Sequence, residues 1–212
     1  MKPAWLRGVA GALTVCAVAV LTIPSTTSAA ATKERNSKAP WKQEPDGFVG
    51  IKFGQPLPAT IRDCPRSRFG GVAYEQLAGL GLCYGGLSRD SYGELHNMPQ
   101  LGFGYNTNIM MDKGTPVSFV LTTSSDNYSR LLEAFTSRYG PPHSVESSTV
   151  QSRAGASYDN HTAEWLGPKV RIVVEKRSDR VDTSEARISD RPYWQEVAKK
   201  SRQKATEGAS QL

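Results

Sequence analysis

The chain has 212 residues, of which 38% are hydrophobic and 22% charged, and its formal net charge is +6 at pH 7. This length suits one domain with a substantial buried core, after allowance for a short N-terminal segment. The excess of basic residues is small, so charge alone does not indicate a nucleic-acid-binding protein.

Residues 1–30 have the three-part pattern of a cleavable secretory signal peptide. Lys2 and Arg7 supply a positive start, and an apolar run over residues 8–23 follows them. This run is shorter than the ~20 apolar residues that a membrane-spanning helix needs. Small residues at 29–31 then offer three cleavage positions. The sequence therefore predicts an exported protein, periplasmic or secreted, with no membrane span after cleavage.

Removal of this signal leaves 24 basic against 20 acidic residues, a formal net charge of +4. An exported protein of this charge is expected to meet an unknown protein or an anionic envelope polymer, and no nucleic acid. Two alternatives for the N-terminal segment are an uncleaved membrane anchor and a lipoprotein attached through Cys16. The second is disfavoured by Val15, which stands where a lipoprotein signal needs a small residue.

Cys64 and Cys83 are the cysteines that remain after cleavage. An even number of cysteines in an oxidising compartment predicts a disulfide. The bond would close a loop rich in glycine, where a covalent link is worth about 3 kcal/mol on the chain-entropy model. The alternative is a reactive thiol beside a base.

In chain order, residues 31–46 are polar and are expected to form a disordered leader. The segment 48–54 alternates and predicts a strand whose buried face carries Val49, Ile51 and Phe53. Residues 65–100 are irregular in pattern and are expected to form loops held by the disulfide.

A hairpin is predicted next, with strands at 101–110 and 117–122 and a turn at 112–115. Residues 126–139 then show helical periodicity, with Asp126 as the expected N-cap and Arg138 favourable at the C-terminal dipole. Gly140 and the prolines after it end this helix. Its expected buried stripe comprises Tyr128, Leu131, Leu132, Phe135 and Tyr139.

Further alternating segments predict a meander, in which Trp165 anchors the core. The expected strands span residues 144–153, 156–165, 170–175 and, more weakly, 181–188. Residues 191–204 predict a short helix. The fold class is thus α+β, an antiparallel sheet in β-β-α-β-β-β order with one main helix on a face. The expected organisation is one domain at 47–190, followed by a C-terminal helix and frayed tail at 191–212.

The sequence has no motif typical of a metal site or of a catalytic nucleophile. His96, His143 and His161 lack metal-ligand spacing, so no metal and no cofactor are predicted. Ser124 and Ser125 have no nucleophile-elbow motif around them. The sequence therefore predicts no catalytic residue, and it favours a non-enzyme without excluding a dispersed site.

A possible partner-binding basic face is formed by Arg153, Lys169 and Arg171, with Tyr158 beside them, if these residues share the sheet face away from the helix. Such a face would suit an anionic polymer or an acidic partner. The alternative is an ordinary solvated sheet face.

Three functions are compatible with these features. The first is a non-enzymatic extracytoplasmic binding or interaction module. The second is an envelope-associated hydrolase with a dispersed site, which a deep pocket joining a histidine to a carboxylate or to Ser124 or Ser125 would favour. The third is a structural subunit of an envelope assembly, docked through its C-terminal helix.

Overall fold

The computed structural model describes residues 33–35 and 41–209. The signal peptide predicted at 1–30, with Cys16 and the cleavage positions, lies outside the described residues, as do 36–40 and the last three residues of the tail. The chain from Ala31 to Leu212 is a compact unit of its own.

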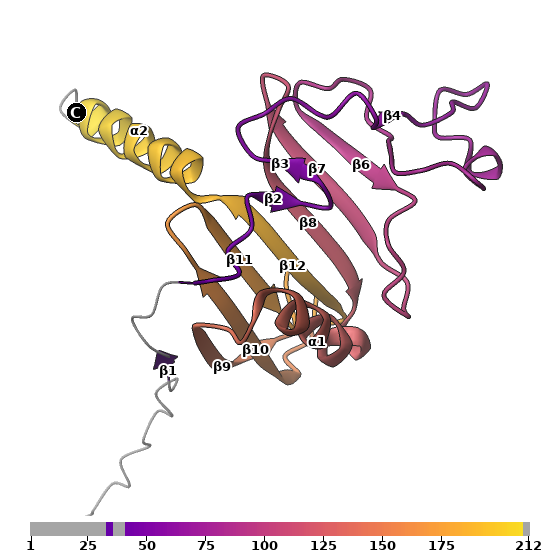
Figure 1. Ribbon diagram of the computed structural model, residues 1–212. Helices are drawn as coiled ribbons and strands as arrows, with labels where there is room; N and C mark the ends of the chain where they lie inside the picture. Colours follow the sequence, from indigo (N-terminus) through magenta and orange to yellow (C-terminus); the bar gives the residue numbers. More distant parts are fainter. Residues whose placement is uncertain (1–32, 36–40, 210–212) are drawn as a thin grey trace, which may run out of the picture. The chain divides into compact units, whose positions relative to one another are not determined.

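Most of the described strands belong to one sheet, with the order β1-β9-β10-β11-β12-β8-β7-β6-β5-β4 (Figure 1). Neighbouring strands are antiparallel except β4 and β5, which are parallel. The α+β prediction is therefore confirmed, but the sheet is mixed and not purely antiparallel. The strands are β1 (Lys33–Arg35), β4 (Arg62–Asp63), β5 (Cys83–Tyr84), β6 (Tyr92–His96), β7 (Asn106–Asp112), β8 (Thr115–Ser124), β9 (Ser144–Gln151), β10 (Ser157–Leu166), β11 (Val170–Glu175) and β12 (Thr183–Asp190).

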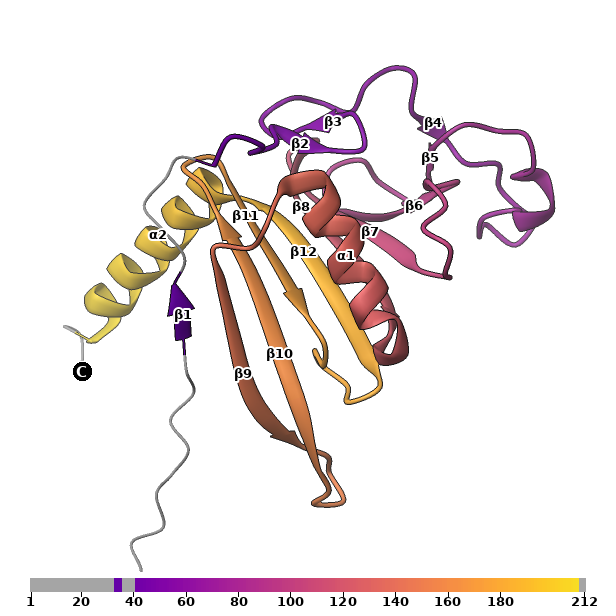
Figure 2. The same cartoon turned by 60° about the horizontal axis from the view of Figure 1, so that its bottom comes forward.

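Helix α1 (Tyr128–Tyr139) connects β8 to β9 and packs on one face of the sheet, while β9 to β12 form a meander (Figure 2). The buried side chains of α1 keep the expected spacing, except that Leu132 is only partly buried. Alternate residues of β11 meet this helix, and the indole of Trp165 lies 6.4 Å from the ring of Phe135, centroid to centroid. The buried stripe on α1 comprises Tyr128, Leu131, Phe135 and Tyr139.

The C-terminal end of α1 is fixed by two tryptophans. Gly140 ends the helix with φ of 82°, a conformation that favours glycine. The indole N–H of Trp41 donates to the carbonyl of Tyr139 at 2.7 Å, and that of Trp165 donates to the carbonyl of Gly140 at 2.8 Å. Two carbonyls that a helix end leaves without partners are thereby satisfied.

The start of α1 differs from the prediction. A 3₁₀ turn, η2 (Ser125–Asn127), precedes the helix, and the hydroxyl of Ser124 accepts a hydrogen bond from the Asp126 N–H. The helix therefore begins two residues later than expected, and Ser124 takes the capping role that was assigned to Asp126.

The strand predicted at 48–54 is instead a two-stranded hairpin of β2 (Gly47–Phe48) and β3 (Ile51–Lys52). The chain reverses at Val49 and Gly50, whose φ values are 45° and 81°. The sequence interpretation was wrong because it assumed extended backbone throughout. Ile51 is still buried, as expected.

Residues 41–46 were expected in a disordered leader, but they pack against the sheet and α1. Besides the bond from Trp41, the carboxylate of Glu44 accepts hydrogen bonds from the backbone N–H groups of Lys169 and Val170 at 2.7 and 2.9 Å. Residues 41–46 therefore belong to the packed part of the chain, ahead of the domain start expected at residue 47. Strand β1 also pairs with β9.

The segment between β3 and β7 is mostly loop, as predicted, and contains one short 3₁₀ turn, η1 (Tyr74–Gln76). Strand β6 was missed, and β7 begins at Asn106 instead of residue 101. The predicted disulfide between Cys64 and Cys83 is confirmed. Its cysteines and Leu77 form a small buried cluster separate from the main core.

Helix α2 (Arg191–Ala209) follows β12 directly and runs five residues further than predicted. None of its residues is buried. Its first turns contact the domain, where the Trp194 indole N–H donates to the carbonyl of Val117 at 3.2 Å. The rest of the helix is exposed.

Candidate functional site

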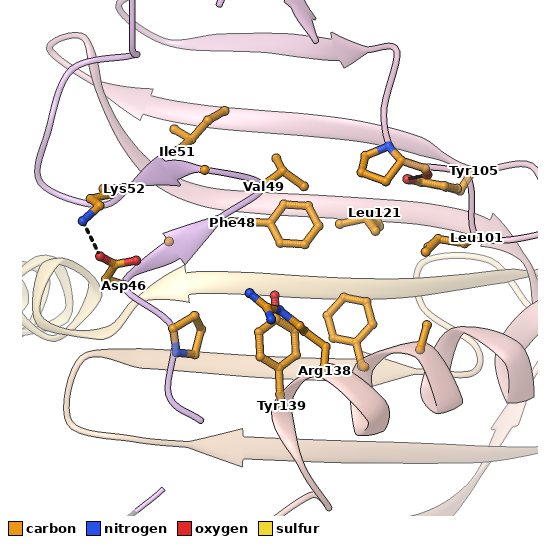
Figure 3. Close-up of a pocket in the computed structure, with 16 residues that line it drawn as sticks. Asp46, Phe48, Val49, Ile51, Lys52, Leu101, Tyr105, Leu121, Arg138 and Tyr139 are labelled. Atoms are coloured by element: carbon orange, nitrogen blue, oxygen red, sulfur yellow. Dashed lines mark hydrogen bonds and ion pairs between the residues drawn. The ribbon is translucent and has the colours of Figure 1, made fainter. Parts of the chain in front are cut away.

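A cavity of about 560 Å³ lies between the β2–β3 hairpin, α1, the segment 99–105 and β8 (Figure 3). The floor is Leu121 of β8. The hairpin and the helix cover neighbouring parts of the same sheet face. The cavity is the space left between their side chains. Its walls are mainly apolar and include Phe48, Val49, Ile51, Leu101, Ala134 and Phe135.

Arg138 gives this cavity an unneutralised cation. It lies in the last turn of α1 and lines the cavity beside Tyr139 (Figure 3). Within the described part of the chain, Arg138 forms no ion pair or side-chain hydrogen bond. Because the two tryptophans fix the end of α1, they also fix the position from which this guanidinium reaches the cavity.

Asp46 and Lys52 form an ion pair of 2.8 Å at the hairpin side of the cavity. The hydrogen bond from Lys52 lowers the pKa of Asp46 below its ordinary value of 3.8, and the same bond raises the pKa of Lys52 above 10.5. Both side chains are more than half exposed, so solvent weakens the interaction. The pair is neutral as a whole and leaves Arg138 as the net charge of the cavity lining.

Two tyrosines add neutral hydroxyl groups to the lining. Burial raises the pKa of Tyr105 and of Tyr139, so both phenols stay protonated at neutral pH. The hydroxyl of Tyr105 donates to the carbonyl of Pro99 and thereby orders the loop at the cavity edge. The residues that line the cavity include no serine, histidine or cysteine. The arrangement is thus suited to binding, and it lacks a nucleophile paired with a base.

The residues of the predicted basic face are not brought together. Lys169 and Arg171 lie at one end of the β10–β11 pair, where Arg171 is opposite Leu166. Tyr158 and Arg153 lie near the other end of β10, roughly 25–30 Å away at the usual rise per strand residue.

Arg171 and Tyr158 also have partners of their own. The guanidinium of Arg171 binds the carboxylate of Glu164 at 2.7 Å. The guanidinium carbon of Arg177 lies over the ring of Tyr158, 4.9 Å from the ring centroid. Arg153 stands in the β9–β10 turn. The four residues are separate features of the surface and do not form one stripe.

The histidines and serines considered for chemistry have structural contacts. The Nδ1 of His143 accepts the backbone N–H of Leu166 at 2.9 Å, and His161 stacks on Tyr128 with ring centroids 6.3 Å apart. His96 packs edge-on against Tyr74. Among the residues that the structure describes, no three His, Cys, Asp or Glu side chains are grouped as metal ligands.

The helices that the structure describes do not have the character of membrane spans. Neither α1 nor α2 combines the length and the apolar character that crossing a membrane would take.

Sequence reasoning missed this cavity. Arg138 was assigned only to the helix dipole, and residues 45–52 were divided between a leader and a single strand. The available signal was Gly50, because a glycine within an alternating segment can mark the turn of a hairpin.

No protein-family model, curated protein sequence or solved structure matches the chain.

Proposed function

We propose that this chain is an exported, non-enzymatic binding module, and that its cavity takes an amphipathic ligand with an apolar body and one anionic group. The observation that carries the proposal is the apolar cavity whose lining contains the unneutralised Arg138. Ligand pockets typically combine apolar walls with few polar groups that set orientation.

The apolar walls favour a ligand whose body is hydrocarbon, since polar groups without hydrogen-bond partners would be costly there. The guanidinium favours a carboxylate or phosphate, which it can bind through two parallel hydrogen bonds. The Asp46–Lys52 pair disfavours a second charge at the hairpin side, because each member is already partnered.

Export is supported by the pattern of residues 1–30 and by the disulfide, a bond typical of oxidising compartments. A protein in a periplasm or outside the cell would meet lipids and other amphipathic molecules. Determining the N-terminus of the protein recovered outside the cytoplasm tests this part. We expect it to begin at Ala30, Ala31 or Thr32, and an intact Met1 would contradict cleavage.

Calorimetric titration of the unit 31–212 with dodecanoate and with dodecanol tests the binding proposal. We expect Arg138→Gln to weaken dodecanoate binding about tenfold and to leave dodecanol binding unchanged, because only the anion loses a charge-assisted hydrogen bond. Ala134→Trp should abolish both, since the indole fills the cavity from the helix side.

The matched control is Arg153→Gln, which removes the same charge from the distant β9–β10 turn. It should leave both titrations unchanged. If neither compound binds, or if Arg138→Gln and Arg153→Gln weaken dodecanoate equally, the cavity proposal is wrong.

A second candidate, a structural subunit of an assembly, is favoured by one observation: α2 has no buried residue over 19 residues. A chain shortened before Glu196 would keep Trp194 in place. If α2 serves assembly, the full-length chain gives a mass in sedimentation that rises with concentration, and the shortened chain does not. The same behaviour of both chains argues against this candidate.

A further inference from the structure

Two neighbouring loops near the β4–β5 end of the sheet carry strongly exposed apolar side chains. Phe69 is 83% exposed and Leu87 is 91% exposed, the two highest values among the large hydrophobic residues that the structure describes. Tyr74 and Leu80 of the same disulfide-linked segment are exposed as well. Such side chains are unfavourable in water unless something covers them.

Arg66 holds these loops next to each other. One terminal nitrogen of its guanidinium donates to the carbonyl of Gly70 at 3.1 Å, and the other donates to the carbonyl of Gly86. Phe69 and Leu87 are the residues adjacent to these two carbonyls. The two apolar tips are therefore carried by one small framework.

Each loop is ordered by its own hydrogen bonds. The first is a tight turn in which the Gly70 N–H donates to the Ser67 carbonyl at 2.9 Å and the Ser67 N–H donates to Gly71 at 2.8 Å. Phe69 stands at the tip of this turn. Its exposure therefore follows from a defined backbone conformation.

The second loop is anchored on both sides of Leu87. The buried hydroxyl of Tyr84 donates to the carbonyl of Ser88. The guanidinium of Arg89 binds the carboxylate of Asp63 through two nitrogens, at 3.0 and 2.8 Å. With Gly86 held by Arg66, Leu87 projects from a loop that is fixed before and after it.

Two arginines without acidic partners lie next to the tips. Within the described residues, neither Arg66 nor Arg68 forms an ion pair; Arg66 binds only backbone carbonyls and Arg68 lies over the Phe69 ring at 4.6 Å from its centroid. Of the two acids in and beside the Leu87 loop, Asp63 is bound to Arg89, and Asp90 binds the Ser88 hydroxyl and forms no ion pair within the described residues. A surface that covers Phe69 would thus also meet two unneutralised guanidinium groups.

We propose that these two loops dock on an anionic phospholipid bilayer, with Phe69 and Leu87 inserted among the headgroups and Arg66 and Arg68 against the phosphates. The shape favours a bilayer over a protein. Separate projecting tips need a matched pocket each on a protein partner, whereas a bilayer interface accepts apolar side chains wherever they enter. Anionic lipids supply the negative charge that the two arginines lack as a partner.

Co-sedimentation of the unit 31–212 with vesicles tests this proposal, since that unit has its own core. We expect it to bind vesicles of phosphatidylcholine mixed with phosphatidylglycerol. Phe69→Ser and Leu87→Ser should each lower the partition coefficient on the order of tenfold, because each removes one inserted apolar side chain. Arg68→Gln should lower it about fivefold on mixed vesicles and have no effect on pure phosphatidylcholine.

The matched control is Leu166→Ser, which removes an exposed leucine from the remote end of β10, where it is 42% exposed. It should bind as the parent does. All variants change exposed side chains, and unchanged thermal unfolding verifies that they are folded.

Failure to bind mixed vesicles would overturn the proposal. It would equally be overturned if Leu166→Ser lost as much binding as Leu87→Ser. A mass that rises with concentration and falls in Phe69→Ser, without any vesicle binding, would assign the tips to a second copy of the chain instead. None of these outcomes depends on the cavity, because no residue of the two loops lines it.

Discussion

Two regions of this protein are stabilised by different means. The region from β8 to β12, with α1, buries a continuous core in which residues such as Phe119, Trp165 and Ile172 are inaccessible to solvent. The disulfide-linked segment 53–91 reaches the main core only through a few side chains such as Ile61 and Tyr84, and its cysteines form a small separate cluster. It is held mainly by a covalent bond, two arginines and the hydroxyl of Tyr84. The comparison shows that a segment without apolar periodicity can be ordered by separate polar and covalent links.

The largest effect is expected in the continuous core. Trp165→Ala should lower the free energy of unfolding by about 3–5 kcal/mol, because it leaves a cavity under α1 and removes the hydrogen bond to Gly140. Urea unfolding measures this change. Trp165→Phe is the control that keeps most of the volume, and it should cost markedly less. Equal losses for both variants would show that the indole hydrogen bond, and not packing, dominates at this position.

The second effect concerns the covalent link. Replacing both cysteines, Cys64→Ala with Cys83→Ala, should lower the free energy of unfolding by about 3 kcal/mol, since a loop of this length loses its constraint in the unfolded state. Limited proteolysis should then cut first within residues 65–82. First cuts within α1 or β9–β12 would contradict the division into two regions.

The third effect concerns one hydroxyl. Tyr84→Phe removes the donor to the carbonyls of Ser88 and Tyr92, and should cost about 1 kcal/mol. Amide hydrogen exchange should rise at residues 86–92 and remain unchanged in α1. The control is Tyr128→Phe, because the Tyr128 hydroxyl makes no hydrogen bond within the described residues. A similar loss of stability in both variants would mean that the loop does not depend on this link.

The ring of Tyr84 also explains two glycines of that region. A Cβ at Gly86 would come within 2.1 Å of the Tyr84 hydroxyl oxygen, and one at Gly93 within 2.2 Å of the ring. Only glycine allows the backbone to approach the ring this closely.

The smallest effect is expected at the exposed Asp46–Lys52 pair. Since the pKa of Asp46 is lowered in the folded state, its contribution to stability is present above pH 3.8 and is lost as the pH falls through the folded pKa. For Lys52 the pKa is raised, so its contribution is present below pH 10.5 and is lost at higher pH. Lys52→Gln should return the Asp46 pKa toward its ordinary value.

Carboxyl chemical shifts followed by NMR during acid titration measure this pKa. Lys113→Gln, at a turn in another part of the chain, is the control and should leave Asp46 unchanged. An Asp46 pKa that is the same with and without Lys52 would show that the pair is not formed in solution.

Much of the α1 region could be predicted because its order arises from local pattern. The spacing of Leu131, Phe135 and Tyr139 defines a helix face, and the glycine after it ends the helix. Strands β10 and β11 likewise follow from alternation. The predicted disulfide needed only two cysteines and an oxidising compartment.

The candidate sites could not be predicted in the same way. The cavity joins residues of the β2–β3 hairpin, α1 and β8, which are far apart in the sequence. The grouping of Arg153, Lys169, Arg171 and Tyr158 failed because residues on neighbouring strands can lie at opposite ends of them, and strand register sets which end. Phe69 and Leu87 became a pair only through the two bonds of Arg66.

By itself, the sequence determined the α+β class, the main helix and its buried face, the meander that follows and the cysteine pair. Each of these depends on periodicity or on residue type, which are properties of a few neighbouring residues. Only the tertiary structure decided the mixed sheet, the reversal at Val49 and Gly50, the packing of Trp41, and the exposure of Arg138 to a cavity. These depend on which distant segments meet, and no local pattern encodes that choice.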